Sequence, residues 1–135
     1  MNGMTSGRAA GRAGVNVETL RYYERRGLIP RPQRTVSNYR IYSEATVRRI
    51  RFIKHAQDIG FTLAEIKELL SLRATRGARC ADVRKRAEAK IRDIERRMRD
   101  LEAMKTALAD LVAGCSGRGA LKECSILDAL DEEEP

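Results

Sequence analysis

The longest regular pattern of apolar and polar positions lies in the second half of the chain, between about residues 80 and 113. Apolar side chains recur there in alternating steps of four and three residues, with one lysine in the series. The positions are Ala87, Ile91, Ile94, Met98, Leu101, Lys105, Leu108 and Val112. This spacing is typical of a coiled-coil seam, which keeps one narrow stripe facing a partner helix. We therefore expect one long helix that pairs with a second copy of the chain, rather than a solvated helix on a monomer.

Three cysteines mark the two ends of this helix. Cys80 begins it, and Cys115 and Cys124 follow shortly after its end. Because a helix rises about 1.5 Å per residue, the 35 residues that separate Cys80 from Cys115 correspond to about 50 Å, too far for a shared site within one chain. An antiparallel pair of helices would place Cys80 of one copy beside Cys115 and Cys124 of the other. It would also keep the two copies of Lys105 apart.

The first half of the chain contains shorter helical stretches. Residues 5–13 and 16–26 predict two short helices, separated at Gly14 and ended by Gly27. Two short helices joined at a glycine form the helix-turn-helix arrangement, whose second helix enters the major groove of DNA. That second helix carries three basic side chains suited to phosphates and guanine edges, Arg21, Arg25 and Arg26.

Residues 30–42 predict an extended hairpin, with a turn at Asn38 because this residue type tolerates positive φ. Arg34 and Arg40 lie close to Tyr39 in this stretch. We therefore expect the hairpin to form a basic β-wing beside the helix-turn-helix.

Two further helices complete the first half. Ser43 caps a stretch that runs to about residue 59, and Thr62 with Glu65 forms a capping box for the next helix. Residues 1–4 are expected as a disordered lead-in, and the chain ends in an acidic tail. The predicted fold class is mainly all-α, with a winged helix-turn-helix DNA-binding domain in residues 1–72, a linker in 73–79, a dimerisation helix in 80–113, and a metal-binding loop and C-terminal tail in 114–135.

Charge is distributed unevenly between the two halves. The 135 residues carry a formal net charge of +8. Residues 1–54 hold twelve basic and three acidic residues, a net +9, whereas the remainder holds fifteen basic and sixteen acidic residues, a net −1. A basic half joined to a near-neutral, pairing half is the footprint of a nucleic-acid binder. Double-stranded DNA is the expected partner.

Several other classes receive little support. No apolar run approaches the length of a membrane span, so we expect a cytoplasmic protein with reduced thiols and no membrane partner. No Ser/His/Asp set, phosphate loop or paired carboxylates indicate an enzyme. The alternative outside the class of regulators is a nucleoid-type DNA-binding protein, which would explain the charge but not the cysteines.

Three segments together closely resemble the MerR family of transcriptional activators. They are GVNVETLRYYERRGLI, then NYRIYSEATVRRIRFIKHAQDIGFTLAEIKELL, then the long helix. The resemblance implies a homodimer that binds promoter DNA, distorts it when an effector binds, and so acts on RNA polymerase. It also implies DNA contacts by Arg21, Tyr23, Tyr39 and Arg40, with Arg34 and Lys54 as phosphate partners.

One departure from the family pattern concerns the first helix. Family members usually place large apolar side chains there, whereas this chain has Ser6 and Ala9. We therefore expect a loosely packed first helix or a different start.

The resemblance also gives the cysteines a role. Cys80, Cys115 and Cys124 match the family's metal-sensing branch, and best its mercury sensors, where two chains build a trigonal thiolate site. Soft thiolates select soft ions, so Hg(II) is the expected effector. Pb(II) remains open because lead sensors share this spacing, and Cd(II) or Zn(II) remain as further alternatives, although zinc prefers four ligands.

Overall fold

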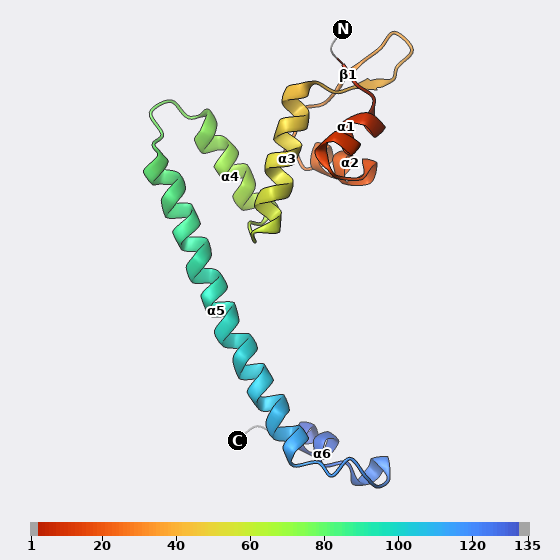
Figure 1. The fold of residues 1–135 in the computed structure, drawn as a ribbon, viewed down its shortest axis with the longest axis vertical. Helices are drawn as coiled ribbons and strands as arrows, with labels where there is room; N and C mark the ends of the chain where they lie inside the picture. The colour runs from red at the N-terminus through yellow and green to blue at the C-terminus, as the bar shows by residue number, and fades with distance from the viewer. Residues whose placement is uncertain (1–2, 133–135) are drawn as a thin grey trace. The chain divides into compact units, whose positions relative to one another are not determined.

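The computed structural model describes residues 3–132 of the chain (Figure 1). Residues 1–2 and 133–135, which include the start of the expected lead-in and the end of the acidic tail, lie outside the described residues. The elements in chain order are α1 (Ser6–Ala13), α2 (Val17–Arg25), β1 (Gln33–Arg34), β2 (Arg40–Ile41), α3 (Glu44–Asp58), α4 (Leu63–Ala74), α5 (Cys80–Ala113), η1 (Leu121–Glu123) and α6 (Ser125–Asp131).

The chain forms two compact units, residues 1–87 and 88–135. The boundary lies within α5, so the first two turns of this helix belong to the N-terminal unit. The helix α4 continues to Ala74, two residues into the segment expected as a linker, and the connection to α5 therefore covers residues 75–79. The division of the first domain at residue 72 stays a prediction.

The helix α1 begins and ends where the sequence indicates. The side-chain oxygen of Thr5 accepts a hydrogen bond from the amide of Arg8, and Gly14 ends the helix with a φ of 75°. Its alanines are buried at 0–4% exposure, namely Ala9, Ala10 and Ala13. The expectation of loose packing is therefore wrong, because small side chains let α1 pack closely against α3 and α2.

The predicted second helix, α2, follows three residues after the end of α1. The side chain of Asn16 accepts a hydrogen bond from the amide of Thr19 at 2.7 Å, which caps the helix. Leu20 and Tyr23 point into the core at 0% and 2% exposure. Gly27, with a φ of 72°, turns the chain toward the hairpin. In Figure 1, α1 and α2 lie together beside α3.

The predicted wing is present as a short antiparallel hairpin. Gln33 pairs with Ile41 and Arg34 with Arg40, and Asn38 in the turn has a φ of 68°. Met4 also joins this region, because its amide and carbonyl exchange hydrogen bonds of 2.9 and 2.8 Å with the backbone of Tyr42. The prediction of a disordered lead-in is therefore wrong for Met4, whose backbone extends the base of the wing and whose side chain is buried.

The core of the N-terminal unit takes side chains from α1, α2, α3 and α4 and from the segments between them. The helices α3 and α4 begin at the predicted caps, Ser43 and the Thr62 capping box. Two outward arginines of α3 tie the helix to the preceding segments, because Arg49 donates to the Leu28 carbonyl at 2.7 Å and Arg51 to the Arg12 carbonyl at 2.8 Å. The largest fully buried side chains are Leu20, Leu28, Tyr42, Val47, Ile50, Ile53 and Ile66.

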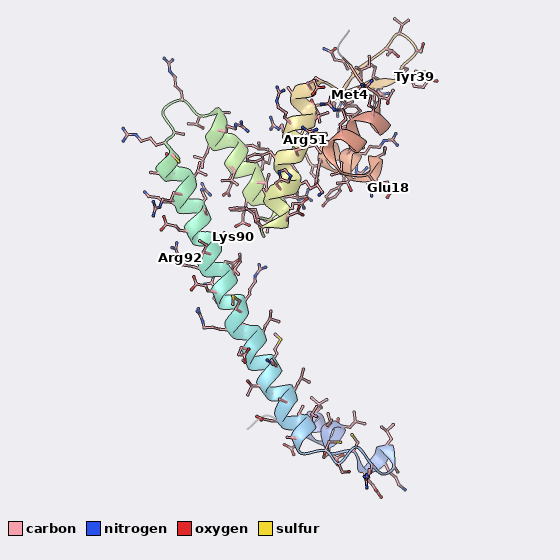
Figure 2. The ribbon with its side chains drawn as sticks, in the orientation of Figure 1. Met4, Glu18, Tyr39, Arg51, Lys90 and Arg92 are labelled. Atoms are coloured by element: carbon pink, nitrogen blue, oxygen red, sulfur yellow. The ribbon has the colours of Figure 1, made fainter. Side chains whose placement is uncertain are left out.

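The helix α5 is continuous over 34 residues, as predicted. Its apolar stripe is exposed to solvent in the single chain, with values of 55% at Ile91, 62% at both Met98 and Leu101, and 63% at Val112. The polar positions form ion pairs along the helix. The carboxylate of Asp93 lies 3.3 Å from the Nζ of Lys90 and 3.3 Å from the Nη2 of Arg96. The hydrogen bond from Lys90 is the largest cause that lowers the pKa of Asp93, and the bond from Arg96 lowers it further. Figure 2 labels Lys90 on this helix.

Two short elements, η1 and α6, follow α5. Both expose leucines, among them Leu121 at 76% and Leu130 at 69%. Among the described residues, no helix combines the length and the apolar character that crossing a membrane requires.

The close packing of α1 can be tested with an enlarged side chain. Ala9→Leu should lower the free energy of unfolding by about 1–3 kcal/mol, because three extra carbons must enter a filled space. Ala64→Leu, at an exposed position of α4, should change it by less than about 0.5 kcal/mol. Urea unfolding followed by circular dichroism measures both. Equal stability of the two variants would contradict the packing described for α1.

Candidate DNA-binding surface and thiol groups

The basic side chains of α2 face outward because the opposite side of the helix is buried. Leu20 and Tyr23 occupy the core side. Arg21 and Arg25 are exposed, and Tyr22 is 40% exposed. The guanidinium carbons of Arg25 and Arg26 lie 5.8 and 5.9 Å from the Tyr22 ring centre. The helix therefore presents a basic and aromatic outer face.

Four of the predicted DNA contacts line one hollow of about 310 Å³. Arg21 comes from α2, and Arg34, Tyr39 and Arg40 come from the hairpin. Residues 5–7, at the start of α1, complete the wall. Tyr39 is 72% exposed and projects from the hairpin (Figure 2). Three guanidinium groups beside the first turn of α1 form an arrangement that attracts phosphate groups.

The hairpin turn is held in shape by its own side chains. The Nη1 of Arg34 donates to the Asn38 carbonyl at 3.1 Å. The amide of Tyr39 donates to the Thr35 hydroxyl at 3.1 Å. Arg34 therefore braces the turn across the hairpin as well as lining the hollow.

Two predicted contacts lie elsewhere. Lys54 is on α3, and its Nζ is 3.8 Å from a carboxylate oxygen of Asp58. Tyr23 is 2% exposed, and its hydroxyl donates to the Gln57 side chain at 2.5 Å. Burial, and then the charge of Asp58, raise the pKa of Tyr23. Tyr23 thus packs in the core, and a direct DNA contact by this ring stays a prediction that its burial does not favour.

Two residues on this surface escaped the sequence analysis. Arg31 and Glu24 line a second hollow of about 600 Å³ together with Arg25, Arg34 and Arg40. The charge of the hairpin segment is a signal that could have identified Arg31. The role of Glu24 depends on contacts between α2 and the wing, and no local pattern indicates it.

Cys115 and Cys124 belong to one closed loop in the C-terminal unit. The hydroxyl of Ser125 donates to the Gly114 carbonyl at 3.2 Å. Gly114 precedes Cys115 and Ser125 follows Cys124, so this hydrogen bond closes the loop that contains both cysteines. The amide of Gly117 donates to the Sγ of Cys115 at 3.4 Å. Gly117 has a φ of 72°, a conformation that favours glycine. Both cysteines are free and partly exposed.

Cys80 lies at the other end of α5, in the N-terminal unit. It is free and exposed, and it lines an apolar cavity of about 740 Å³ with Val83, Leu72 and Phe52. His55 is exposed and also lines this cavity. Within the part of a single chain that the structure describes, no three His, Cys, Asp or Glu side chains gather closely enough to hold a metal ion.

A helix pair that presents arginines, followed by a hairpin that extends the same basic surface, defines a winged helix-turn-helix DNA-binding protein. The family profile described as the MerR HTH family regulatory protein matches residues 4–73, and the one described as MerR, DNA binding matches residues 47–111. The chain belongs to the MerR family of transcriptional regulators.

Named relatives match over nearly their whole length. The chain is 45% identical to a mercuric resistance operon regulatory protein of Bacillus cereus, over 92% of this chain and 94% of that protein. It is 43% identical to the protein of the same description from Serratia marcescens, over 100% of this chain and 93% of that one. These relatives are described as regulators of transcription.

The solved structures that are similar to this chain include two regulators in complex with a metal ion. A transcription regulator of Ralstonia metallidurans in complex with lead(II) matches with a TM-score of 0.83 and 35% identity, covering 94% of this chain and 98% of that one. A regulator of Bacillus megaterium in complex with mercury(II) matches with a TM-score of 0.71 and 39% identity, covering 91% and 95%.

The different placements of the two adjacent tyrosines can be tested by substitution. Tyr23→Ala removes a buried ring, so the free energy of unfolding should fall by roughly 3 kcal/mol or more. Tyr22→Ala removes a ring from the outer face of α2, so stability should change by less than about 1 kcal/mol while DNA affinity falls. Urea unfolding and DNA titration of the same preparations measure both effects. An equal loss of stability in the two variants would contradict this assignment.

Proposed function

We propose that this protein is a metal-responsive regulator that binds promoter DNA as a homodimer and activates a metal-resistance promoter when a soft metal ion binds. The observation that carries the proposal is the distribution of its three free thiols, one at the start of α5 and two in a closed loop after its end. Hg(II) is the effector that we favour. The relatives described as mercuric resistance regulators support this choice.

The exposed stripe of α5 supports pairing with a second copy. Ile91, Met98, Leu101, Leu108 and Val112 are each 55–63% exposed in the single chain. A continuous apolar stripe of this kind is unfavourable in water and is covered when two helices pair. Lys105 lies on the same stripe, and antiparallel pairing separates its two copies. We therefore propose an antiparallel dimer.

Pairing in this direction completes a thiolate site at each end of the helix pair. Because α5 is one continuous helix, Cys80 cannot reach Cys115 of its own chain. In the antiparallel dimer, Cys80 of one copy meets Cys115 and Cys124 of the other. Three thiolates suit Hg(II), whereas Zn(II) prefers four ligands. Pb(II) also fits, and the lead(II) complex of a structural relative supports it as the alternative, with Cd(II) behind it.

Metal binding then acts on the DNA-binding units. An ion held by both copies fixes the ends of the two α5 helices, and each Cys80 is close in sequence to the core of its own DNA-binding unit. We propose that this constraint rotates the two units and distorts the promoter so that RNA polymerase can use it. Arg21, Arg34, Tyr39, Arg40 and Lys54 are the proposed contacts to DNA.

The shared site can be tested by mixing two defective subunits. The Cys80→Ala subunit lacks one ligand, and the Cys115→Ala/Cys124→Ala subunit lacks the other two. Their heterodimer should contain one complete site, so it should hold Hg(II) against a competing thiol with a three-sulfur absorption edge, whereas neither homodimer should. Unchanged Hg(II) affinity and three sulfurs in the Cys80→Ala homodimer would disprove the shared site.

The identity of the effector requires a separate readout. Run-off transcription from the cognate promoter should rise with Hg(II) at lower concentrations than with Pb(II), Cd(II) or Zn(II), and the Cys80→Ala homodimer serves as the matched control. Activation by Pb(II) at the lowest concentration would replace Hg(II) as effector but retain the thiolate site. No activation by any of these ions would contradict the proposed function.

A further inference from the structure

We propose that Glu24 is a positioning residue that fixes the wing to α2 and orients Arg40 for DNA. This inference rests on the proposed DNA contact by Arg40. Its basis is a set of contacts between three side chains that come from different parts of the N-terminal unit, namely Glu24, Arg40 and Tyr42.

Glu24 lies in the last turn of α2, and its side chain is only 13% exposed. One carboxylate oxygen accepts a hydrogen bond from the Tyr42 hydroxyl at 3.0 Å. The other lies 3.5 Å from the Nε of Arg40. The carboxylate of Glu24 therefore contacts both Arg40 and Tyr42, which lie on either side of Ile41 in the second half of the wing.

Tyr42 provides the fixed end of this link. It is 1% exposed, and two backbone hydrogen bonds with Met4 hold it at the base of the wing. Burial is the main cause that raises the pKa of Tyr42, so its hydroxyl keeps its proton and remains a donor to Glu24 over the physiological range. The position of the carboxylate is thus set by a rigid partner.

Arg40 is the functional end of the link. Its side chain is 30% exposed, and its Nε is buried without a hydrogen-bond partner among the described residues. The carboxylate of Glu24 compensates the charge beside this buried atom. Because a guanidinium group is planar and has five donors, pairing at Nε leaves the two terminal nitrogens for a phosphate group.

The negative charge at position 24 supports a role in orienting Arg40. Glu24 is one of three acids among the first 54 residues, and it lies on a surface that attracts DNA. A carboxylate repels phosphate groups and loses solvation when it is shielded from water. Packing alone would be served as well by an apolar side chain. Orientation of an arginine requires the charge.

A double-mutant cycle tests whether Glu24 acts through Arg40. Glu24→Gln keeps an oxygen that accepts the Tyr42 bond but removes the charge that pairs with Arg40. The probe is a short duplex enriched by repeated in vitro selection with the unaltered dimer. Glu24→Gln should weaken binding about fivefold in the unaltered background and less than about twofold in the Arg40→Ala background, because coupled residues are not additive.

A matched control separates positioning from bulk charge. Glu18→Gln removes the same charge from the exposed first turn of α2 and should leave binding unchanged or slightly tighter. Thermal unfolding of all variants checks that the fold is retained. The expected result is a loss of affinity in Glu24→Gln without a matching loss of stability.

Three outcomes would overturn the inference. One is unchanged or tighter binding by the Glu24→Gln variant, and another is an equal loss in both Arg40 backgrounds, which would make Glu24 a general structural residue. The third is an Arg40→Ala variant that binds as well as the unaltered dimer. In each case the unaltered dimer still binds the selected duplex, so the proposed regulation of a promoter stands, and only the third outcome also removes the proposed Arg40 contact. A failure of the unaltered dimer to bind or select any duplex would contradict both the inference and the proposed function.

Discussion

The proposed sensor depends on one physical constraint, the stiffness of an uninterrupted α-helix. The helix α5 runs from Cys80 to Ala113, so groups at its two ends cannot meet within one chain. The same helix exposes an apolar stripe that water disfavours. A second copy resolves both problems in the proposed dimer, because it covers the stripe and supplies the missing thiols. In the proposed function, metal sensing and dimerisation thus depend on the same element.

The DNA-binding unit obeys a different constraint, which is close packing around a small core. Alanines on α1 allow that helix to approach α3, and this approach fixes the start of α1 beside the wing. Polar contacts then set the functional surface. Arg49 and Arg51 tie α3 to its neighbours, and Glu24 joins α2 to the wing. The arginines that we propose as DNA contacts are therefore held on a rigid frame, which would reduce the entropy lost on binding.

Sequence patterns predicted most of the elements because their signals are local. Caps at Asn16 and Thr62 begin helices, and the positive φ expected at Asn38 shapes the turn of the wing. Features that depend on contacts between residues far apart in the sequence could not be predicted from these patterns. The pairing of Met4 with Tyr42 is one example. The exposure of Tyr22 is another, because the helical spacing places Tyr23 on the inner side of α2 and leaves the side of Tyr22 open. The thiolate site was predicted from the spacing of the cysteines and the family resemblance, and it stays a prediction because its parts lie at the two ends of α5.

The direction of helix pairing is the central claim, and a distance between two copies of one position tests it directly. Lys85 is exposed and lies off the apolar stripe. If Cys80 meets the partner's Cys115, Lys85 lies opposite the partner's Asp110, 25 residues along the helix. Pulsed electron paramagnetic resonance between nitroxides attached at position 85 through a non-cysteine side chain should therefore give about 40 Å. A distance below roughly 25 Å, as expected for two parallel helices side by side, would contradict the account.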